Sequence, residues 1–263
     1  ERELEYQPGN VINIGWYCTD RICQQGKAEK TALLWEGQGV PDRSYSYNDI
    51  RLASNTIGAY LRSLGIGAGD RVCLFMDKIP ELYLGFLGVL KIGAIAQPLF
   101  SAFGDESLLV RLDDAKTKAI ITQRKHALKV RKILAQMPYL EHVIIVDHDG
   151  KKELKEREIP FSLDTAAPVE HLEIHPTTAE SPSVLHYTSG TTGQPKGVQH
   201  VHYSLISQYL TAKWVLDIHD DDIYWCTADP GWVTGTSYGI IAPFALGVTQ
   251  CVLVQVIYHG WDN

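Results

Sequence analysis

The sequence has 263 residues, of which 45% are hydrophobic and 21% are charged, the balance of a globular protein with a sizeable core. Its formal net charge of −7 at pH 7 argues against a surface built to bind duplex nucleic acid or an anionic membrane. The five cysteines form no Cys-x-x-Cys pair, and no apolar run approaches the length of a membrane span. We therefore expect reduced thiols, a cytoplasmic location, and neither a nucleic-acid nor a membrane partner.

Helical and strand patterns alternate regularly between residues 44 and 147. The expected elements, in chain order, are a helix capped by Asn48 and ended by Gly65, a strand over 71–76, a helix from Pro80 to Leu90, a strand over 94–100, a helix around 108–115, a strand over 118–122, a helix over 127–137 and a strand over 142–147. Short apolar strands separated by helices are typical of parallel sheets. The sequence therefore predicts an α/β fold of layered sheet and helices, with a mostly parallel sheet covered on both faces.

Periodicity is lost between residues 147 and 181, where charged residues mix with prolines. We expect a surface connection there, with room for one or two short strands. Order resumes with a strand over 198–202 and a helix over 203–216. We divide the chain into an N-terminal extension (1–43), a βαβ sheet unit (44–150), a linker (151–180) and a glycine-loop unit (181–263).

The stretch from Tyr187 to Val198, YTSGTTGQPKGV, gathers small hydroxyl side chains, glycines and one lysine. Its free backbone amides, hydroxyl donors and ammonium group suit the oxygens of a polyphosphate. It is not a P-loop, because Lys196 does not follow a glycine and a strand pattern comes after it in place of a helix. We expect the loop to join two strands and to hold phosphate; a flexible polar turn is the alternative.

These residues resemble the phosphate-binding loop of the adenylate-forming enzymes, a family that includes acyl-CoA synthetases, luciferases and peptide-synthetase adenylation domains. So many specified positions make a chance match far rarer than for a lone GxGxxG. A second stretch, Asp222–Gly235, is similar to the acetyl-CoA synthetase branch of the family, although plain core packing would also place tryptophans beside a strand. The resemblance covers most of the chain and implies an incomplete, N-terminal part of an adenylate-forming enzyme.

The resemblance implies a set of site residues. Those implied to contact the ATP phosphates are Thr188, Ser189, Gly190, Thr191, Thr192, Gly193 and Lys196. Thr188 and Lys196 are the implied catalytic residues among them. The implied acyl pocket consists of Trp232, Val233, Thr234 and Gly235, and Arg124 is a candidate for binding coenzyme A.

The resemblance also implies a two-step reaction. Acetate attacks the α-phosphate of MgATP to give acetyl-adenylate and pyrophosphate, and the thiol of coenzyme A then displaces AMP. The implied cofactors are ATP, Mg²⁺ and coenzyme A, and the small-molecule partners are acetate, ATP and coenzyme A. A propionyl- or medium-chain acyl-CoA synthetase is an alternative, since a pocket wall rejects an extra methylene by only about 1–3 kcal/mol. A non-catalytic scaffold that keeps the fold is another.

Later motifs of the family are not found in this sequence: an aromatic adenine-binding motif with a magnesium-binding glutamate, an aspartate for the ribose, a hinge, and a mobile C-terminal domain with a catalytic lysine. Residues 255–263 also fit the family poorly. We therefore expect a fragment that lacks the second half of the AMP-binding domain and the C-terminal domain. Such a fragment is expected to be inactive alone and to have the missing half of the enzyme as a partner.

Three further features have simpler explanations. His200 and His202, with His186 nearby, have no cysteine or carboxylate at ligand spacing, so they are expected to be structural and no metal ligand is predicted. The basic residues from 124 to 132 are expected to be a solvated helix face. Asp113 and Asp114 are expected to be solvated surface groups, because adjacent helical residues point in different directions.

Overall fold

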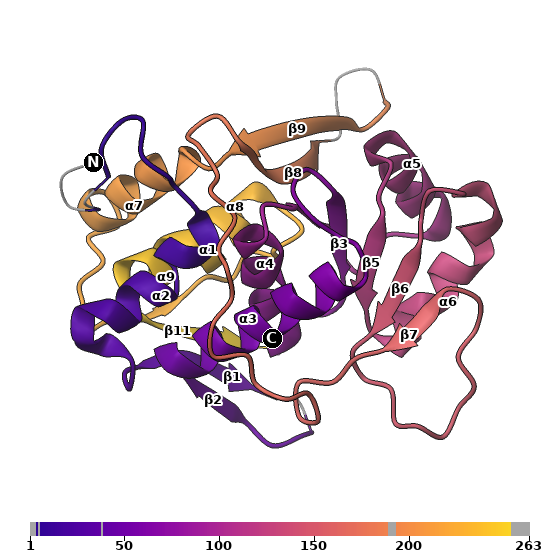
Figure 1. Cartoon of the computed structure of the whole chain (residues 1–263), viewed down its shortest axis with the longest axis horizontal. Helices are drawn as coiled ribbons and strands as arrows, with labels where there is room; N and C mark the ends of the chain where they lie inside the picture. Colours follow the sequence, from indigo (N-terminus) through magenta and orange to yellow (C-terminus); the bar gives the residue numbers. More distant parts are fainter. Residues whose placement is uncertain (1–3, 5, 38, 189–192, 254–263) are drawn as a thin grey trace, which may run out of the picture.

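The computed structural model describes Leu4 and residues 6–37, 39–188 and 193–253. Its strands form two sheets, and helices lie between the sheets and over the outer face of the larger one (Figure 1). No helix within these ranges is long and apolar enough to cross a membrane.

The larger sheet has seven strands in the order β7-β6-β5-β3-β4-β8-β9. Neighbouring strands run parallel except β8 and β9, which form an antiparallel pair. The strands are β3 (Arg71–Phe75), β4 (Ile95–Pro98), β5 (Ala119–Thr122), β6 (His142–Ile145), β7 (Glu158–Pro160), β8 (Pro182–Thr188) and β9 (Lys196–Val201). The predicted α/β fold with a mostly parallel sheet is confirmed.

The smaller sheet has four strands in the order β10-β11-β1-β2. The strands are β1 (Thr31–Glu36), β2 (Arg43–Ser46), β10 (Ile223–Trp225) and β11 (Thr249–Leu253). Strand β11 runs parallel to both β10 and β1, and β2 is antiparallel to β1. The first and last described strands of the chain therefore lie side by side in one sheet.

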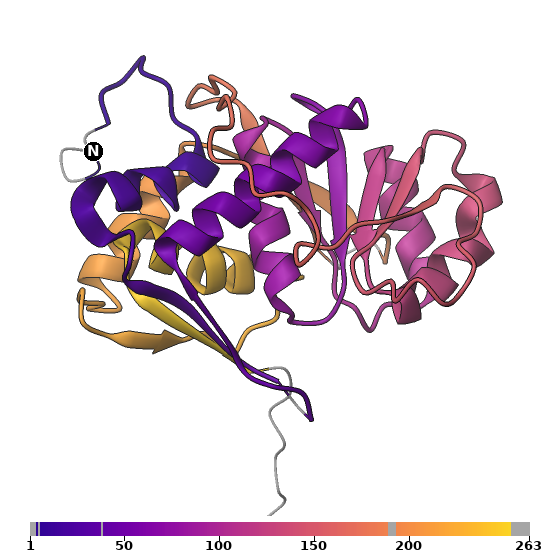
Figure 2. The same ribbon diagram turned by 60° about the horizontal axis from the view of Figure 1, so that its bottom comes forward.

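Within the described ranges, five helices have ten or more residues: α3 (Tyr47–Ser63), α4 (Pro80–Lys91), α5 (Asp105–Ala115), α6 (Arg124–Ile133) and α7 (Ser204–Trp214). The shorter helical segments are α1 (Ile14–Tyr17), α2 (Asp20–Ile22), η2 (Cys23–Lys27), η3 (Leu134–Gln136), α8 (Val233–Thr236), η4 (Ser237–Ile241) and α9 (Ala242–Leu246). Helices α3 and α4 pack on each other between the two sheets, whereas α5 and α6 cover the opposite face of the larger sheet (Figures 1 and 2).

The buried strand β3 serves two cores at once. Its Val72 and Leu74 belong to the core that α3 and α4 share, whereas Cys73 and Phe75 belong to the core under α5 and α6. Because side chains alternate along a strand, a sheet covered on both faces needs apolar residues at every position. This explains the unbroken apolar run that predicted the strand.

Helix α3 begins earlier than predicted. The prediction that Asn48 caps it is wrong, because Ser46 and Asp49 form a capping box: the Ser46 hydroxyl accepts from the Asp49 amide at 3.1 Å, and the Asp49 carboxylate accepts from the Ser46 amide at 2.8 Å. Reciprocal bonds of this kind satisfy amides that the first turn leaves unpaired. Asn48 instead accepts hydrogen bonds from the Arg51 guanidinium.

Strand pairing links the ranges into which the sequence was divided. Strand β1, from the range 1–43, pairs with β11, and β4, from the range 44–150, pairs with β8. The range 151–180 contains β7. After β7 the chain reaches the N-terminal segment, where the Thr177 hydroxyl donates to the Ile12 carbonyl at 2.6 Å. The phosphate-loop hairpin therefore extends directly from the larger sheet.

Candidate nucleotide and acyl site

The antiparallel pair β8–β9 is the frame of the predicted phosphate loop. Register pairs Thr188 with Lys196, so the last residue of β8 lies opposite the first residue of β9. Both residues are exposed, and the hairpin projects beyond the end of the larger sheet (Figure 1). Gly193 has a φ of +83°, a conformation that side chains disfavour. The predicted Ser189, Gly190, Thr191 and Thr192 lie outside the described residues.

The base of this hairpin is fixed to helix α5. The Tyr187 hydroxyl donates to Asp114 Oδ2 at 2.7 Å, and burial, aided by this hydrogen bond, raises the pKa of Tyr187 well above its usual range. A Cβ on Gly197 would lie 3.3 Å from the Leu185 side chain, so the two strands approach closely here. The loop is thus carried by a rigid element, which suits a site that must hold its donors in fixed positions.

The stretch predicted to border the acyl group forms a tight turn before α8. The Asp229 carboxylate accepts from the Gly231 amide at 2.8 Å, and the Asp229 carbonyl accepts from the Trp232 amide at 2.9 Å. Burial raises the pKa of the Asp229 carboxyl group. The turn presents Trp232, Val233 and Thr234 on the surface.

Two glycines make this turn possible. A Cβ on Gly235 would lie 2.0 Å from the Asp229 carbonyl oxygen, and a Cβ on Gly231 would lie 2.4 Å from the Phe100 amide nitrogen. Neither contact is compatible with a side chain. Gly235, predicted as a pocket residue, thus also has a structural role in closing the turn.

One hydrogen bond joins the two predicted site segments. His186 on β8 contacts the Thr236 hydroxyl at 2.7 Å through Nε2, and Thr236 donates to the Val233 carbonyl at 3.1 Å. Nε2 therefore carries the proton that Thr236 accepts, and Nδ1 is buried without a partner among the described atoms. Burial lowers the pKa of His186 to about 4, which keeps it neutral at physiological pH.

His202, also buried, is hydrogen-bonded to the protein backbone. His202 accepts from the Ile14 amide at 3.1 Å through Nδ1, and burial lowers its pKa to about 3. The described ranges contain no group of three or more His, Cys, Asp or Glu side chains that could hold a metal ion.

Sequence reasoning missed an aromatic cluster that connects the two segments by a second route. The Trp232 ring lies 6.2 Å from the Phe100 ring and 6.3 Å from the Phe103 ring, centroid to centroid. The Arg111 guanidinium lies 4.3 Å from the Phe103 centroid and 6.0 Å from the Tyr187 centroid. Phe103 and Arg111 gave no signal in the sequence, because their pairing depends on tertiary structure.

Arg124 is the first residue of helix α6. Its backbone amide donates to Asp147 Oδ1 at 2.6 Å, and its guanidinium has no hydrogen bond or ion pair among the described residues. The other cations of this helix are bound to protein groups: Lys125 to Asp77, Lys129 to the Ser101 and Phe103 carbonyls, Arg131 to Glu158 and Lys132 to Asp105. Lys125 and Lys132 are exposed, as expected of a solvated face, whereas Lys129 and Arg131 are half-buried, so the expectation is wrong for these two.

The expectation for Asp113 and Asp114 needs a similar correction. They do point apart, but each accepts a hydrogen bond from a tyrosine, Tyr139 at 2.6 Å and Tyr187 at 2.7 Å respectively. Both carboxylates thereby attach helix α5 to its neighbours.

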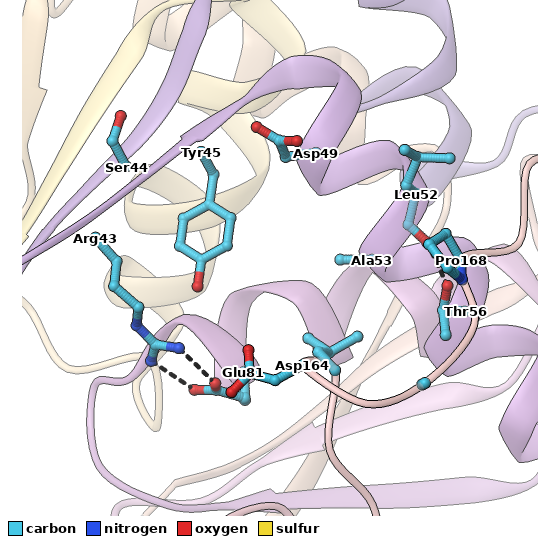
Figure 3. Close-up of a pocket in the computed structure, with 12 residues that line it drawn as sticks. Arg43, Ser44, Tyr45, Asp49, Leu52, Ala53, Thr56, Glu81, Asp164 and Pro168 are labelled. Carbon is cyan, nitrogen blue, oxygen red and sulfur yellow. Dashed lines mark hydrogen bonds and ion pairs between the residues drawn. The ribbon is translucent and has the colours of Figure 1, made fainter.

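The structure also has a pocket away from these segments. It has a volume of about 370 Å³ and lies between β2, α3 and the segment 163–168 (Figure 3). In its wall Arg43 binds Glu81 through two hydrogen bonds of 2.9 and 3.2 Å. Thr188, Lys196 and the residues from Trp232 to Gly235 do not line this pocket.

Comparison with protein families agrees with the fold and with the motifs. The family model described as AMP-binding enzyme matches residues 20–257, so the chain belongs to the AMP-binding enzyme family. This confirms the resemblance found in the sequence.

Individual relatives within the family have more specific names. Acetyl-coenzyme A synthetase of Bacillus subtilis (strain 168) is 42% identical over 245 residues, which are 92% of this chain and 42% of the relative. Acetyl-coenzyme A synthetase of Pyrobaculum arsenaticum is 34% identical over 275 residues, covering 96% of this chain and 40% of the relative. The chain thus spans about two fifths of the length of these curated relatives.

A solved structure supports the same relationship. The crystal structure of Brucella canis acyl-CoA synthetase matches with a TM-score of 0.84 and 29% sequence identity. The match covers 96% of this chain and 45% of that chain.

Proposed function

We propose that this chain provides the phosphate-binding and acyl-binding part of an ATP-dependent acetate–CoA ligase. The pairing of Thr188 with Lys196 across the β8–β9 hairpin is the observation that carries the proposal. It sets a hydroxyl donor and an ammonium group at the two ends of a loop rich in hydroxyls and glycines. Membership in the AMP-binding enzyme family supports this assignment, and so do the names of the relatives.

In the proposed first step, a carboxylate oxygen of acetate attacks the α-phosphorus of ATP, and the bond to the pyrophosphate oxygen breaks. The products are acetyl-adenylate and pyrophosphate. Lys196 and the hydroxyl of Thr188, together with Ser189, Thr191 and Thr192, bind the phosphate oxygens and offset their negative charge. Positioning and charge neutralisation are the main demands of phosphoryl chemistry, so no covalent nucleophile on the protein is needed.

In the proposed second step, the thiol of coenzyme A attacks the acetyl carbonyl and AMP leaves. Arg124 would bind a phosphate of coenzyme A, since its guanidinium makes no hydrogen bond or ion pair within the described part of the chain. Mg²⁺ is proposed to enter bound to ATP. Since the described residues form no metal-binding cluster, we assign no step to Mg²⁺.

The wall formed by Trp232, Val233 and Thr234 would set the length of the acyl chain. Trp232 is supported by Phe100 and Phe103, so its ring can close one side of a small pocket. Each extra methylene in the substrate would cost about 1–3 kcal/mol, so acetate would be preferred over propionate by a limited factor.

Magnesium-dependent binding of ATP tests the proposal, and pyrophosphate exchange tests whether this chain is inactive alone. This chain alone, incubated with MgATP, acetate and labelled pyrophosphate, is expected to bind nucleotide weakly and to give no labelled ATP. Exchange by the chain alone would contradict its expected inactivity. Absence of magnesium-dependent ATP binding would favour the non-catalytic scaffold instead.

A further inference from the structure

The cavity between β2, α3 and the segment 163–168 has the dimensions of a small-molecule site (Figure 3). Its volume of about 370 Å³ lies within the range of pockets that bind small ligands. It shares no lining residue with the phosphate hairpin or with the acyl turn. A ligand bound here would therefore occupy a site of its own.

The wall that the segment 163–168 forms is held in place at both ends. After the segment, the Val169 amide donates to the Thr56 hydroxyl on α3 at 3.0 Å. Before it, the Phe161 ring lies 4.5 Å from the Tyr60 ring on the same helix, centroid to centroid. Because both ends are attached to α3, we expect the cavity to keep its shape in solution.

The positive charge in the wall is already neutralised. Among the described residues that line the cavity, only Arg43 is cationic, and it forms two hydrogen bonds of 2.9 and 3.2 Å with the Glu81 carboxylate. The guanidinium also lies 4.8 Å from the centroid of the Trp35 ring, which holds it against the wall. Arg43 therefore offers no unpaired positive charge to an anionic ligand.

Two further carboxylates in the wall have no cationic partner. Asp164 makes no hydrogen bond or ion pair with any described residue, and Asp49 accepts only from Ser46 at the start of α3. Since the charges of the Arg43–Glu81 pair cancel, these two carboxylates leave the cavity with a net negative charge. Such a wall favours a cationic ligand over a neutral or an anionic one.

Tyr45 adds an aromatic ring and a hydroxyl group to the same cavity. Figure 3 shows the ring extending from β2 toward the Arg43–Glu81 pair, and its hydroxyl makes no hydrogen bond within the described ranges. Burial raises the pKa of Tyr45 to about 12; Arg43 opposes this rise, and Glu81, Asp164 and Asp49 add to it. The neutral hydroxyl can accept a hydrogen bond from a ligand, and the ring can contact a cation.

The remaining wall is aliphatic and suits an alkyl chain. It consists of Leu52, Ala53, Leu163, Ala166 and Pro168. A bare metal ion fits less well, because the part of the chain that the structure describes has no group of three or more His, Cys, Asp or Glu side chains that could hold one. The occupant that matches both the charge and the aliphatic wall is an organic cation.

We propose that this cavity binds a small primary aliphatic amine in its ammonium form. The ammonium group donates hydrogen bonds to the Asp164 carboxylate and to the Tyr45 hydroxyl, and the alkyl chain lies along Leu52 and Ala53. The cavity rejects carboxylates and phosphates of similar size, because its net charge repels them. It is therefore distinct in chemistry as well as in position from the proposed nucleotide and acyl site.

Titration of the 263-residue chain with three ligands of equal length tests the proposal. The ligands are butylamine, 1-butanol and butanoate, at constant pH 7 and constant ionic strength, and binding is followed by NMR. We expect saturable one-to-one binding of butylamine, at least about tenfold tighter than that of butanol, because only the amine supplies a charge-assisted hydrogen bond. Butanoate should not bind.

Matched variants locate the site. Asp164→Asn keeps the size of the side chain and removes its charge, and it is expected to weaken butylamine binding at least about tenfold. Tyr45→Phe keeps the ring and removes the hydroxyl, and a loss of about threefold is expected. Asp221→Asn is the control, because Asp221 is also exposed but does not line the cavity. It should leave the affinity unchanged.

Three results would overturn the proposal. One is equal binding of butylamine and butanol, which would show that the charge has no role. Another is an unchanged affinity of Asp164→Asn for butylamine. The third is an equal loss in Asp164→Asn and Asp221→Asn, which would show a general effect of surface charge. None of these outcomes depends on whether the chain binds ATP.

Discussion

The Nε2 atom of His186 lies 2.7 Å from the hydroxyl oxygen of Thr236, and this bond ties the strand before the phosphate loop to the helix after the acyl turn. Both side chains are buried. Two segments that are 50 residues apart in sequence are thereby fixed relative to one another. The bond therefore fixes the base of the candidate phosphate-binding hairpin against the candidate acyl-binding turn.

Replacing Thr236 by valine keeps the shape of this contact and removes its acceptor. We expect Thr236→Val to lower the free energy of unfolding by about 1–3 kcal/mol, because His186 then has a buried donor without a partner. Urea denaturation measures the loss. Thr165→Val, at an exposed position, should change stability by less than about 0.5 kcal/mol. Equal stability of both variants would show that the bond contributes nothing.

The acyl turn should reject any side chain at Gly235. We expect Gly235→Ala to destabilise the protein by about 2–4 kcal/mol, because the new Cβ would lie 2.0 Å from the Asp229 carbonyl oxygen. Gly67→Ala is the matched control, since a Cβ there meets no atom within 4 Å and φ is not positive. Thermal unfolding of the two variants separates steric strain from the general effect of replacing glycine.

Lys91 makes the free energy of unfolding depend on pH in the alkaline range. It is fully buried, it binds Asp20 at 2.7 Å, and burial lowers its pKa from 10.5 to about 8. Above pH 8 the folded protein releases this proton while the unfolded chain retains it up to about 10.5, so this residue's contribution to stability rises with pH in that window.

The variant Lys91→Met removes this titration. We expect the stability of the unaltered protein relative to the variant to increase by about 1 kcal/mol between pH 7.5 and 9. Taking the difference cancels the opposing effect of buried thiols such as Cys18 and Cys73, whose raised pKa values reduce stability at high pH in both proteins. A difference that stays constant with pH would contradict the assignment.

His202 should make the protein sensitive to acid. Its pKa is lowered from 6.5 to about 3, so below pH 6.5 the unfolded chain binds a proton that the folded protein does not. Its contribution to stability is therefore present above pH 6.5 and is lost as pH falls toward 3. Between pH 7 and 5 the unaltered protein should lose about 2 kcal/mol more than His202→Asn, which can still accept from the Ile14 amide. Parallel acid titrations followed by circular dichroism would reveal whether the two proteins differ.

Local patterns in the sequence predicted much of the fold. Apolar runs and helical periodicity predicted β3, α4 and most of their neighbours. Both faces of the larger sheet are covered, so its strands are apolar throughout and its helices show a clear apolar period. The start of α3 was missed, since Asn48 and Ser46 are both acceptable caps and only the return bond of Asp49 decides between them. Strand β1 was not recognised at all, and its partner β11 lies more than 200 residues later.

The candidate site was likewise predicted only where it depends on residues that are contiguous in the sequence. The hairpin at Thr188 and Lys196 was predicted because it depends on a contiguous motif. The cation–π contact of Arg111 with Phe103 and the bond between His186 and Thr236 depend on tertiary packing, which leaves no signature within either segment.

The central claim is that the β8–β9 hairpin binds the triphosphate of ATP, and calorimetric titration with MgATP tests it most directly. We expect Lys196→Ala to weaken binding at least about tenfold, the loss of one charge-assisted contact to phosphate, and Lys151→Ala, which removes an exposed lysine from the connection, to leave binding unchanged. Equal affinity of the unaltered protein and Lys196→Ala for MgATP would contradict the claim.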